Sequence, residues 1–66
     1  MKIKLNDIIV DSPEGATLQE VLDNAGIAPT GIAVAVNSVV IPATERSSHI
    51  LNDGDSVLII KAFYGG

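Results

Sequence analysis

Only one segment of this 66-residue chain carries the signals of an α-helix, and short apolar runs flank it on both sides. Thr17 and Glu20 have the spacing of a capping box, in which each side chain accepts a hydrogen bond from the other residue's backbone N–H. Apolar residues follow at intervals of three and four and share one helix face: Leu18, Val21, Leu22 and Ala25. Gly26 comes next, and glycine readily adopts the left-handed conformation that ends a helix. The sequence therefore predicts one amphipathic helix between Thr17 and Gly26.

The chain before this helix has the pattern of a β-hairpin. Residues 1–5 alternate lysine with apolar side chains, which indicates a strand with one buried face. Asn6-Asp7 is predicted to be a turn, and the β-branched run at 8–10 suits a second strand. Residues 11–15 are rich in turn-forming types and are predicted to be a loop.

A second hairpin is predicted after the helix. Residues 32–36 are apolar without alternation, which favours a strand covered on both sides. Asn37-Ser38 suits a two-residue turn into a strand at 39–41, and Pro42 stops pairing there or confines it to an edge. Residues 43–51 are irregular, with room for one short helical turn.

The last strand, at residues 57–60, is another continuous apolar run and follows a strong turn signal at 52–55. Since there is one helix, it must cover one face of a mixed sheet to bury its stripe. The continuous runs at 32–36 and 57–60 belong in the middle of that sheet, and 8–10 and 39–41 suit its edges. If the last strand lies parallel to the first, the fold is a β-grasp: an α+β domain with about five strands packed on one helix. We expect residues 1–66 to form this single domain, with a tail at about 62–66.

Charge and composition exclude several classes of function. The net charge is −4, so the chain would repel the phosphates on which nucleic-acid binding depends. Phe63 and Tyr64 are its two large aromatic residues, too few to form a base-stacking platform. No apolar run approaches the roughly 20 residues needed to cross a membrane. We therefore expect a cytoplasmic protein that binds neither nucleic acid nor membranes.

The side chains that carry catalysis are scarce. His49 is the single histidine, there is no cysteine, and the adjacent Ser47 and Ser48 lack the geometry of a nucleophile beside its base. Asp53 and Asp55 flank a glycine, but no further ligands follow at calcium-loop spacing. The sequence thus predicts no catalytic site, no metal site and no bound cofactor, so the chain is not expected to be an enzyme.

The carboxyl end is different, because the chain stops at Gly65-Gly66. Glycine has no Cβ, so such a tail can thread a narrow channel in any backbone conformation. Its carboxylate is also unhindered for attack on a phosphorus centre. The alternative is a frayed terminus without a role.

Three segments carry a resemblance to a known family. They are the apolar hairpin at 32–42, the turn into the last strand at 51–57, and the terminal pair Gly65-Gly66. In these segments the chain resembles the sulfur-carrier proteins of thiazole biosynthesis, the ThiS family, which are relatives of the molybdopterin-synthase small subunit and of ubiquitin. The resemblance covers essentially the whole chain and implies a β-grasp fold.

The resemblance also implies a function. An ATP-using activating enzyme would adenylate the Gly66 carboxylate, and sulfur from a persulfide donor, such as a cysteine desulfurase relay, would displace AMP. The product would be a thiocarboxylate, from which a thiazole synthase would collect the sulfur for thiamine biosynthesis. ATP would be used by the partner, and the carrier would supply a presented carboxylate and a docking face.

Partner contacts are predicted at four residues. Tyr64 is the better candidate for an exposed contact in the tail, whereas Phe63 either seals the core or touches a partner. The pair is bulkier than the small or aliphatic residues expected there. Asp53 and Asp55 are candidates for docking onto a basic surface of the activating enzyme, and their reversal to lysine should weaken association. A second departure is Ala43-Thr44, where relatives commonly have a basic or aromatic residue.

Three alternatives remain open at the level of sequence. The chain could be a carrier for molybdopterin synthase or for another sulfur-containing product. It could be a non-covalent β-grasp interaction module, in which an apolar strip near the last strand binds a partner. It could also be a ubiquitin-like modifier that forms amide bonds with lysines.

Overall fold

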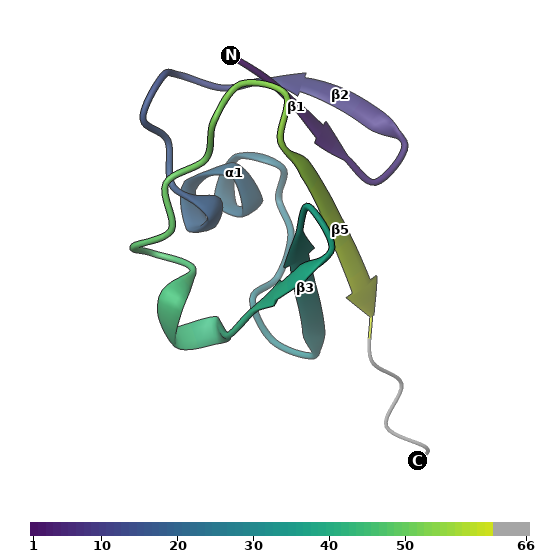
Figure 1. Cartoon of the computed structure of the whole chain (residues 1–66). Helices are drawn as coiled ribbons and strands as arrows, with labels where there is room; N and C mark the ends of the chain where they lie inside the picture. Colours follow the sequence, from purple (N-terminus) through teal and green to yellow (C-terminus); the bar gives the residue numbers. More distant parts are fainter. Residues whose placement is uncertain (62–66) are drawn as a thin grey trace.

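The computed structural model describes residues 1–61, which form one helix and a five-stranded sheet (Figure 1). The predicted order of elements along the chain is confirmed, including one short helical turn between residues 43 and 51. The elements are β1 (Lys2–Leu5), β2 (Ile8–Asp11), α1 (Leu18–Asn24), β3 (Ile32–Val36), β4 (Val39–Ile41), the 3₁₀ helix η1 (Ala43–Glu45) and β5 (Ser56–Lys61). No helix in residues 1–61 has the length and apolar character needed to cross a membrane.

The strands lie side by side in the order β2-β1-β5-β3-β4, so the last strand is the central one. β5 runs parallel to β1, with Lys4 opposite Ser56 and Leu5 opposite Val57. The other neighbours pair in antiparallel fashion, and β2 and β4 form the edges. The predicted β-grasp arrangement and the predicted central and edge strands are therefore confirmed.

Helix α1 begins as the sequence predicts. The Glu20 N–H donates to Thr17 Oγ1 at 3.2 Å, and the Thr17 N–H donates to Glu20 Oε1 at 3.2 Å, which completes the capping box. Leu18, Val21 and Leu22 are buried, as the apolar stripe requires.

The prediction was wrong for the fourth member of the stripe, because Ala25 is exposed. Ala25 is the C-cap residue, one position beyond the last helical residue, and Gly26 follows with φ of 72°. The chain leaves the helix there and turns away before this methyl group can reach the sheet.

The core lies between α1 and one face of the sheet, which we call the core face (Figure 1). It combines inward-facing side chains of the strands with the helix stripe and one residue of the loop before β5. These buried apolar residues are Ile3, Leu5, Ala16, Leu18, Val21, Leu22, Val34, Val36, Ile41, Leu51 and Val57.

The prediction that the continuous run at 32–36 is covered on both sides is confirmed for residues 34–36, which are all buried, and was wrong at Ala33. Ala33 is exposed, and in the neighbouring central strand β5 Leu58 and Ile60 are 50% and 52% exposed. The reason is that a single helix can cover only one face of the sheet. A continuous apolar run here marks a central strand whose second face has no helix over it and is exposed at Ala33, Leu58 and Ile60.

The loop between β4 and β5 supplies hydrogen-bond acceptors for the first N–H groups of helix α1. The first N–H groups of a helix have no partner within it. The Leu18 N–H donates to the His49 carbonyl at 2.8 Å, and the Gln19 N–H donates to the Arg46 carbonyl at 3.0 Å. The irregular segment therefore supports α1 from outside the helix.

Arg46 also fastens this loop to the connection between α1 and β3. Its side chain is almost fully buried, at 4% exposed, and its guanidinium donates to the carbonyls of Pro29 at 3.2 Å and Ile32 at 3.1 Å. Its Nε has no partner in the described part of the chain. Arg46 thus holds the entry to β3 in place. It is a basic residue in the segment after Pro42, two positions beyond the Ala43-Thr44 departure.

Candidate functional site

The residues predicted to carry the chemistry, Phe63, Tyr64, Gly65 and Gly66, lie outside the residues that the structure describes. β5 is the element that precedes them, and it ends at Lys61. The site that can be described is therefore β5 and the sheet surface around it.

β5 is held along both of its edges. On one side it pairs with β3 over five positions, from Val36 opposite Val57 to Ile32 opposite Lys61. On the other side it pairs with β1 at its amino end. The antiparallel pairing reaches the last described residue, so the backbone is fixed up to the point where the tail begins.

Two asparagines, one in each hairpin turn, accept hydrogen bonds from β5 on opposite sides of the strand. Asn6, in the β1–β2 turn, accepts the Ile59 N–H on its Oδ1 at 2.8 Å. Asn37, in the β3–β4 turn, accepts the Ser56 N–H on its Oδ1 at 3.0 Å. Their φ angles are 53° and 49°, and asparagine tolerates this left-handed region better than most residues.

Sequence reasoning identified both turns and missed these contacts. The signal available was the choice of asparagine, rather than glycine, in each turn. Glycine would accept the positive φ equally well. It would carry no side chain to hold the neighbouring strand.

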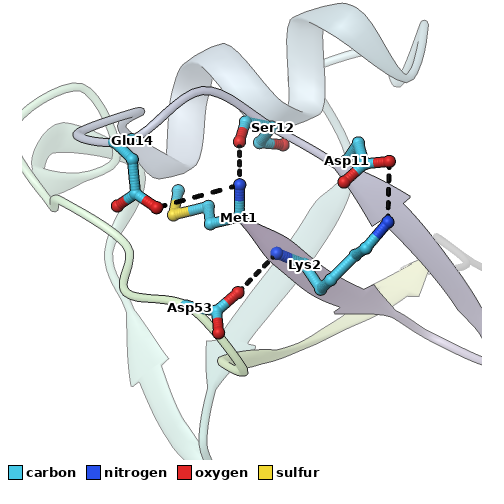
Figure 2. A network of polar contacts seen from close by, with 6 residues as sticks. All are labelled: Met1, Lys2, Asp11, Ser12, Glu14 and Asp53. Carbon is cyan, nitrogen blue, oxygen red and sulfur yellow. Dashed lines mark hydrogen bonds and ion pairs between the residues drawn. The ribbon is translucent and has the colours of Figure 1, made fainter.

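Asp53 and Asp55 lie in the turn that leads into β5, and their carboxylates are engaged within the molecule. Asp53 Oδ1 accepts the Lys2 N–H at 2.6 Å, as Figure 2 shows. Asp55 accepts the Asn52 N–H at 2.8 Å and a side-chain N–H of Asn37 at 2.9 Å. Both residues therefore stabilise the turn, and their contact with a partner stays a prediction.

The face of the sheet opposite α1 carries an exposed apolar patch. In a sheet, residues directly opposite each other on neighbouring strands share a face. The register Val40–Ala35–Leu58 crosses three strands, and Ala33 lies opposite Ile60. Val40, Leu58 and Ile60 are 67%, 50% and 52% exposed, and the small side chain of Ala35 is buried between its neighbours at 8%. We call Ala33, Ala35, Val40, Leu58 and Ile60 the open face.

An apolar surface that rests on the central strand is typical of a protein–protein contact. It is the strip near the last strand that the interaction-module alternative requires, and a carrier needs such a docking face as well. The patch alone does not separate these two functions.

The groups considered for catalysis are not brought together. His49 is half-buried in the loop before β5, where its carbonyl serves the helix N-terminus. Within residues 1–61, no three histidine, cysteine or carboxylate side chains lie close enough to hold a metal ion.

Comparison with known proteins agrees with this geometry. A model of the ThiS family matches residues 2–66. The chain is 32% identical over 66 residues to the sulfur carrier protein ThiS of Escherichia coli strain K12, and the match covers all of both chains. It is 38% identical over 53 residues to the sulfur carrier protein ThiS of Thermus thermophilus, covering 80% of this chain and 83% of that one.

The fold is also similar to that of a solved structure. The crystal structure of the thiamine biosynthesis protein ThiS from Geobacter metallireducens superposes with a TM-score of 0.80 at 26% identity. The match covers 100% of this chain and 99% of that one.

Proposed function

This chain belongs to the ThiS family of sulfur carriers, and we propose that it carries sulfur on the carboxylate of Gly66 for thiazole formation in thiamine biosynthesis. The observation that supports this most strongly is the extent of the family match. It runs to residue 66 and so includes the terminal Gly65-Gly66 pair. The function therefore rests on the end of the chain, and the described domain presents it.

The proposed chemistry occurs in two stages, both catalysed by partners. First, a carboxylate oxygen of Gly66 attacks the α-phosphorus of ATP on an activating enzyme, which releases pyrophosphate and forms an acyl-adenylate. Second, the terminal sulfur of a persulfide attacks the acyl carbon and AMP leaves. A further thiolate then attacks the donor's sulfur in the acyl disulfide, so that a new disulfide forms between the thiolate and the donor and the thiocarboxylate is released on Gly66. The chain binds no cofactor in this scheme and supplies no acid or base.

The domain's contribution is to aim the tail. Because β5 is paired up to Lys61, the domain fixes the point at which the tail begins, so a partner that docks on the sheet lies close to that point. β5 is central and hydrogen-bonded on both edges, and its side chains Leu58 and Ile60 belong to the open face. The open face is the docking surface for the activating enzyme in this scheme. Thiazole synthase is the enzyme that takes the sulfur from Gly66.

Intact-mass spectrometry tests this function directly. The chain with its native carboxyl terminus is incubated with host extract, ATP and a sulfur source. We expect a mass gain equal to the exchange of one oxygen for one sulfur, and no gain when Gly66 is deleted. An unchanged mass, in an extract that activates a known carrier, would contradict the proposal and favour a non-covalent binding module.

The docking surface needs a separate variant. Leu58→Asp places a charge in the open face, and we expect it to slow the mass gain by at least about tenfold, as loss of a well-buried interface contact does. Ser47→Asp, on an exposed loop residue, makes the same change in net charge and should react like the unmodified chain. Equal rates for the two variants would place the docking surface elsewhere.

A further inference from the structure

Lys4 borders the open face close to the point where β5 begins. Lys4 lies opposite Ile9 on β2 and opposite Ser56 on β5. Ser56 and Leu58 are two positions apart on one strand, so Lys4 shares the face of Leu58. Its side chain is exposed.

The other basic groups of the described chain have partners or lie elsewhere. Lys2 pairs with Asp11 at 2.8 Å, and the Arg46 guanidinium is buried against two carbonyls. Lys61 lies at the opposite end of β5. Within residues 1–61, no carboxylate comes within 4.0 Å of the Lys4 ammonium group. In a chain of net charge −4, this leaves a positive charge unneutralised beside an apolar surface.

A hollow of about 440 Å³ lies beside this lysine. Its walls come from the two hairpin turns, the start of β5 and the open face, and include Lys4, Asn37, Ser56 and Leu58. Asp7 also borders it but forms no ion pair with Lys4. The hollow is thus large enough for a side chain, and its lining includes the apolar residues Ala35 and Leu58 as well as the basic residue Lys4.

A partner that covers the open face removes water from the Lys4 ammonium group. If it offers only apolar atoms, the Lys4 ammonium loses water without a replacement, which disfavours binding. If it offers a carboxylate, attraction replaces the lost hydration and also steers the encounter. Complementarity therefore selects an acidic side chain on the partner.

We propose that the hollow beside Lys4 receives an aspartate or glutamate side chain of the activating enzyme, presented from an otherwise apolar docking surface. This inference rests on the proposed function, and it adds the chemistry of the partner's surface. It also moves the electrostatic contact away from Asp53 and Asp55, whose carboxylates are used within the turn. The net charge predicted that acidic residues of this chain contact a basic surface of the enzyme. Here a basic residue of this chain contacts an acidic group of the enzyme.

The position of Lys4 gives this contact an orienting role. Ser56 and Lys61 are five residue steps apart, or about 17 Å of extended strand, so Lys4 lies far from the start of the tail. Contacts at both ends of a strand define its direction better than contacts at one end. Lys4 is therefore a positioning residue, and its loss should raise KM for the carrier and leave kcat nearly unchanged.

The test measures binding of full-length carrier variants to the purified activating enzyme of the same host. Lys4→Gln should weaken binding about fivefold to tenfold at low salt, as loss of an interfacial charge pair does. The difference should largely disappear at about 0.5 M salt, where such charges are screened. Ser47→Glu makes the same change in net charge at an exposed loop residue and should bind like the unmodified chain.

Two more variants separate charge from shape. Lys4→Arg keeps the positive charge and should restore most of the affinity. Asp7→Asn removes a negative charge from the rim of the hollow and should bind no more weakly than the unmodified chain. Thermal unfolding of each variant checks that the fold is intact.

The outcomes distinguish this inference from the function on which it rests. Equal affinities of Lys4→Gln and the unmodified chain at low salt, or weaker binding by Asp7→Asn, would overturn the acidic contact. The sulfur mass gain of the unmodified chain would be unaffected by that result. Absence of the mass gain would instead overturn the proposed function, whatever Lys4 contributes to binding.

Discussion

The two faces of the sheet are built from the same kinds of side chain and have opposite environments. In β5, Val57 is 1% exposed beneath the helix, and the next residue, Leu58, is 50% exposed on the other face. Successive side chains of a strand point to opposite faces, so neighbours in sequence are separated by the sheet. The core face stabilises the fold, whereas the open face leaves apolar area available for a partner.

The difference shows how the last strand of a small domain can be anchored in the core and still carry exposed apolar side chains. Because β5 is central, its core-facing residues fasten it to the helix, and its open-facing residues lie on the exposed surface. One strand therefore contributes both to the stability of the domain and to its exposed apolar surface. The following predictions test this division, beginning with the largest expected effect.

The same truncation should have different effects on the two faces. Leu22→Ala removes a fully buried side chain and should lower the free energy of unfolding by about 3 kcal/mol. Leu58→Ala should change it by less than about 1 kcal/mol, because half of that side chain is already in water. Chemical denaturation of both variants measures the contrast. Similar losses would mean that the open face contributes to folding as much as the core does.

Arg46 tests whether the buried polar contact next to the core is needed. Arg46→Met keeps the apolar length of the side chain and leaves the carbonyls of Pro29 and Ile32 without their donors. We expect a loss of about 2 kcal/mol in the free energy of unfolding, the usual size for the loss of hydrogen bonds made by a charged group. Lys61→Met, at an exposed position, is the matched control and should be nearly neutral. A stable Arg46→Met protein would show that these bonds contribute nothing net.

Variants of Asn37 test how much its side-chain hydrogen bonds stabilise β5, the strand that contributes to both faces of the sheet. Asn37→Ala loses the bonds to Ser56 and Asp55 and also places alanine at φ of 49°, and together these should cost about 2 kcal/mol. Asn37→Gly loses the bonds but accepts the φ angle, so about 1 kcal/mol is expected. Hydrogen exchange at the Ser56 amide should become faster in both variants. Unchanged exchange there would contradict a role for Asn37 in holding β5.

The smallest effect on the free energy of unfolding is expected for the pair of Lys2 on β1 and Asp11 on β2, which lie opposite each other. The hydrogen bond and the charge of Lys2 lower the pKa of Asp11 below its usual 3.8 (Figure 2). A lowered pKa stabilises the fold above the pKa of the unfolded chain, and this contribution is lost as the pH falls through the folded value.

Thermal unfolding between about pH 2 and pH 6 measures this effect, since that range spans the titration of a carboxyl group. Asp11→Asn should be slightly less stable than the unmodified chain near pH 6, and the two should converge at the acidic end. Because the pair is exposed, the difference should be small. A constant difference across the whole range would mean that ionisation of Asp11 is not its cause.

The elements of the fold could be predicted from local signals. The capping box at Thr17 and Glu20, the apolar stripe and Gly26 define the helix, and the asparagine turns define the hairpins. Each of these signals acts between residues close in the chain, so they are visible without the tertiary structure.

The failures have one physical cause, which is that burial depends on what else the chain can place nearby. The run at 32–36 was expected to be covered on both sides, and on its second face Ala35 is buried but Ala33 is exposed. Arg46 attracted no prediction, although it is among the most buried residues, because its carbonyl partners at Pro29 and Ile32 lie 17 and 14 residues away.

The sequence by itself determined the identity of the helix and strands and the terminal diglycine on which the proposed chemistry rests, whereas the parallel pairing of the last strand with the first was decided by the tertiary structure. Only the tertiary structure decided which face of the sheet stays open and that the Asp53 and Asp55 carboxylates are used internally. It also decided that Lys4 borders the open face without a carboxylate partner in residues 1–61. Strand and turn preferences are local energies, whereas the neighbours of a charge or an apolar side chain are set by contacts between segments far apart in the chain.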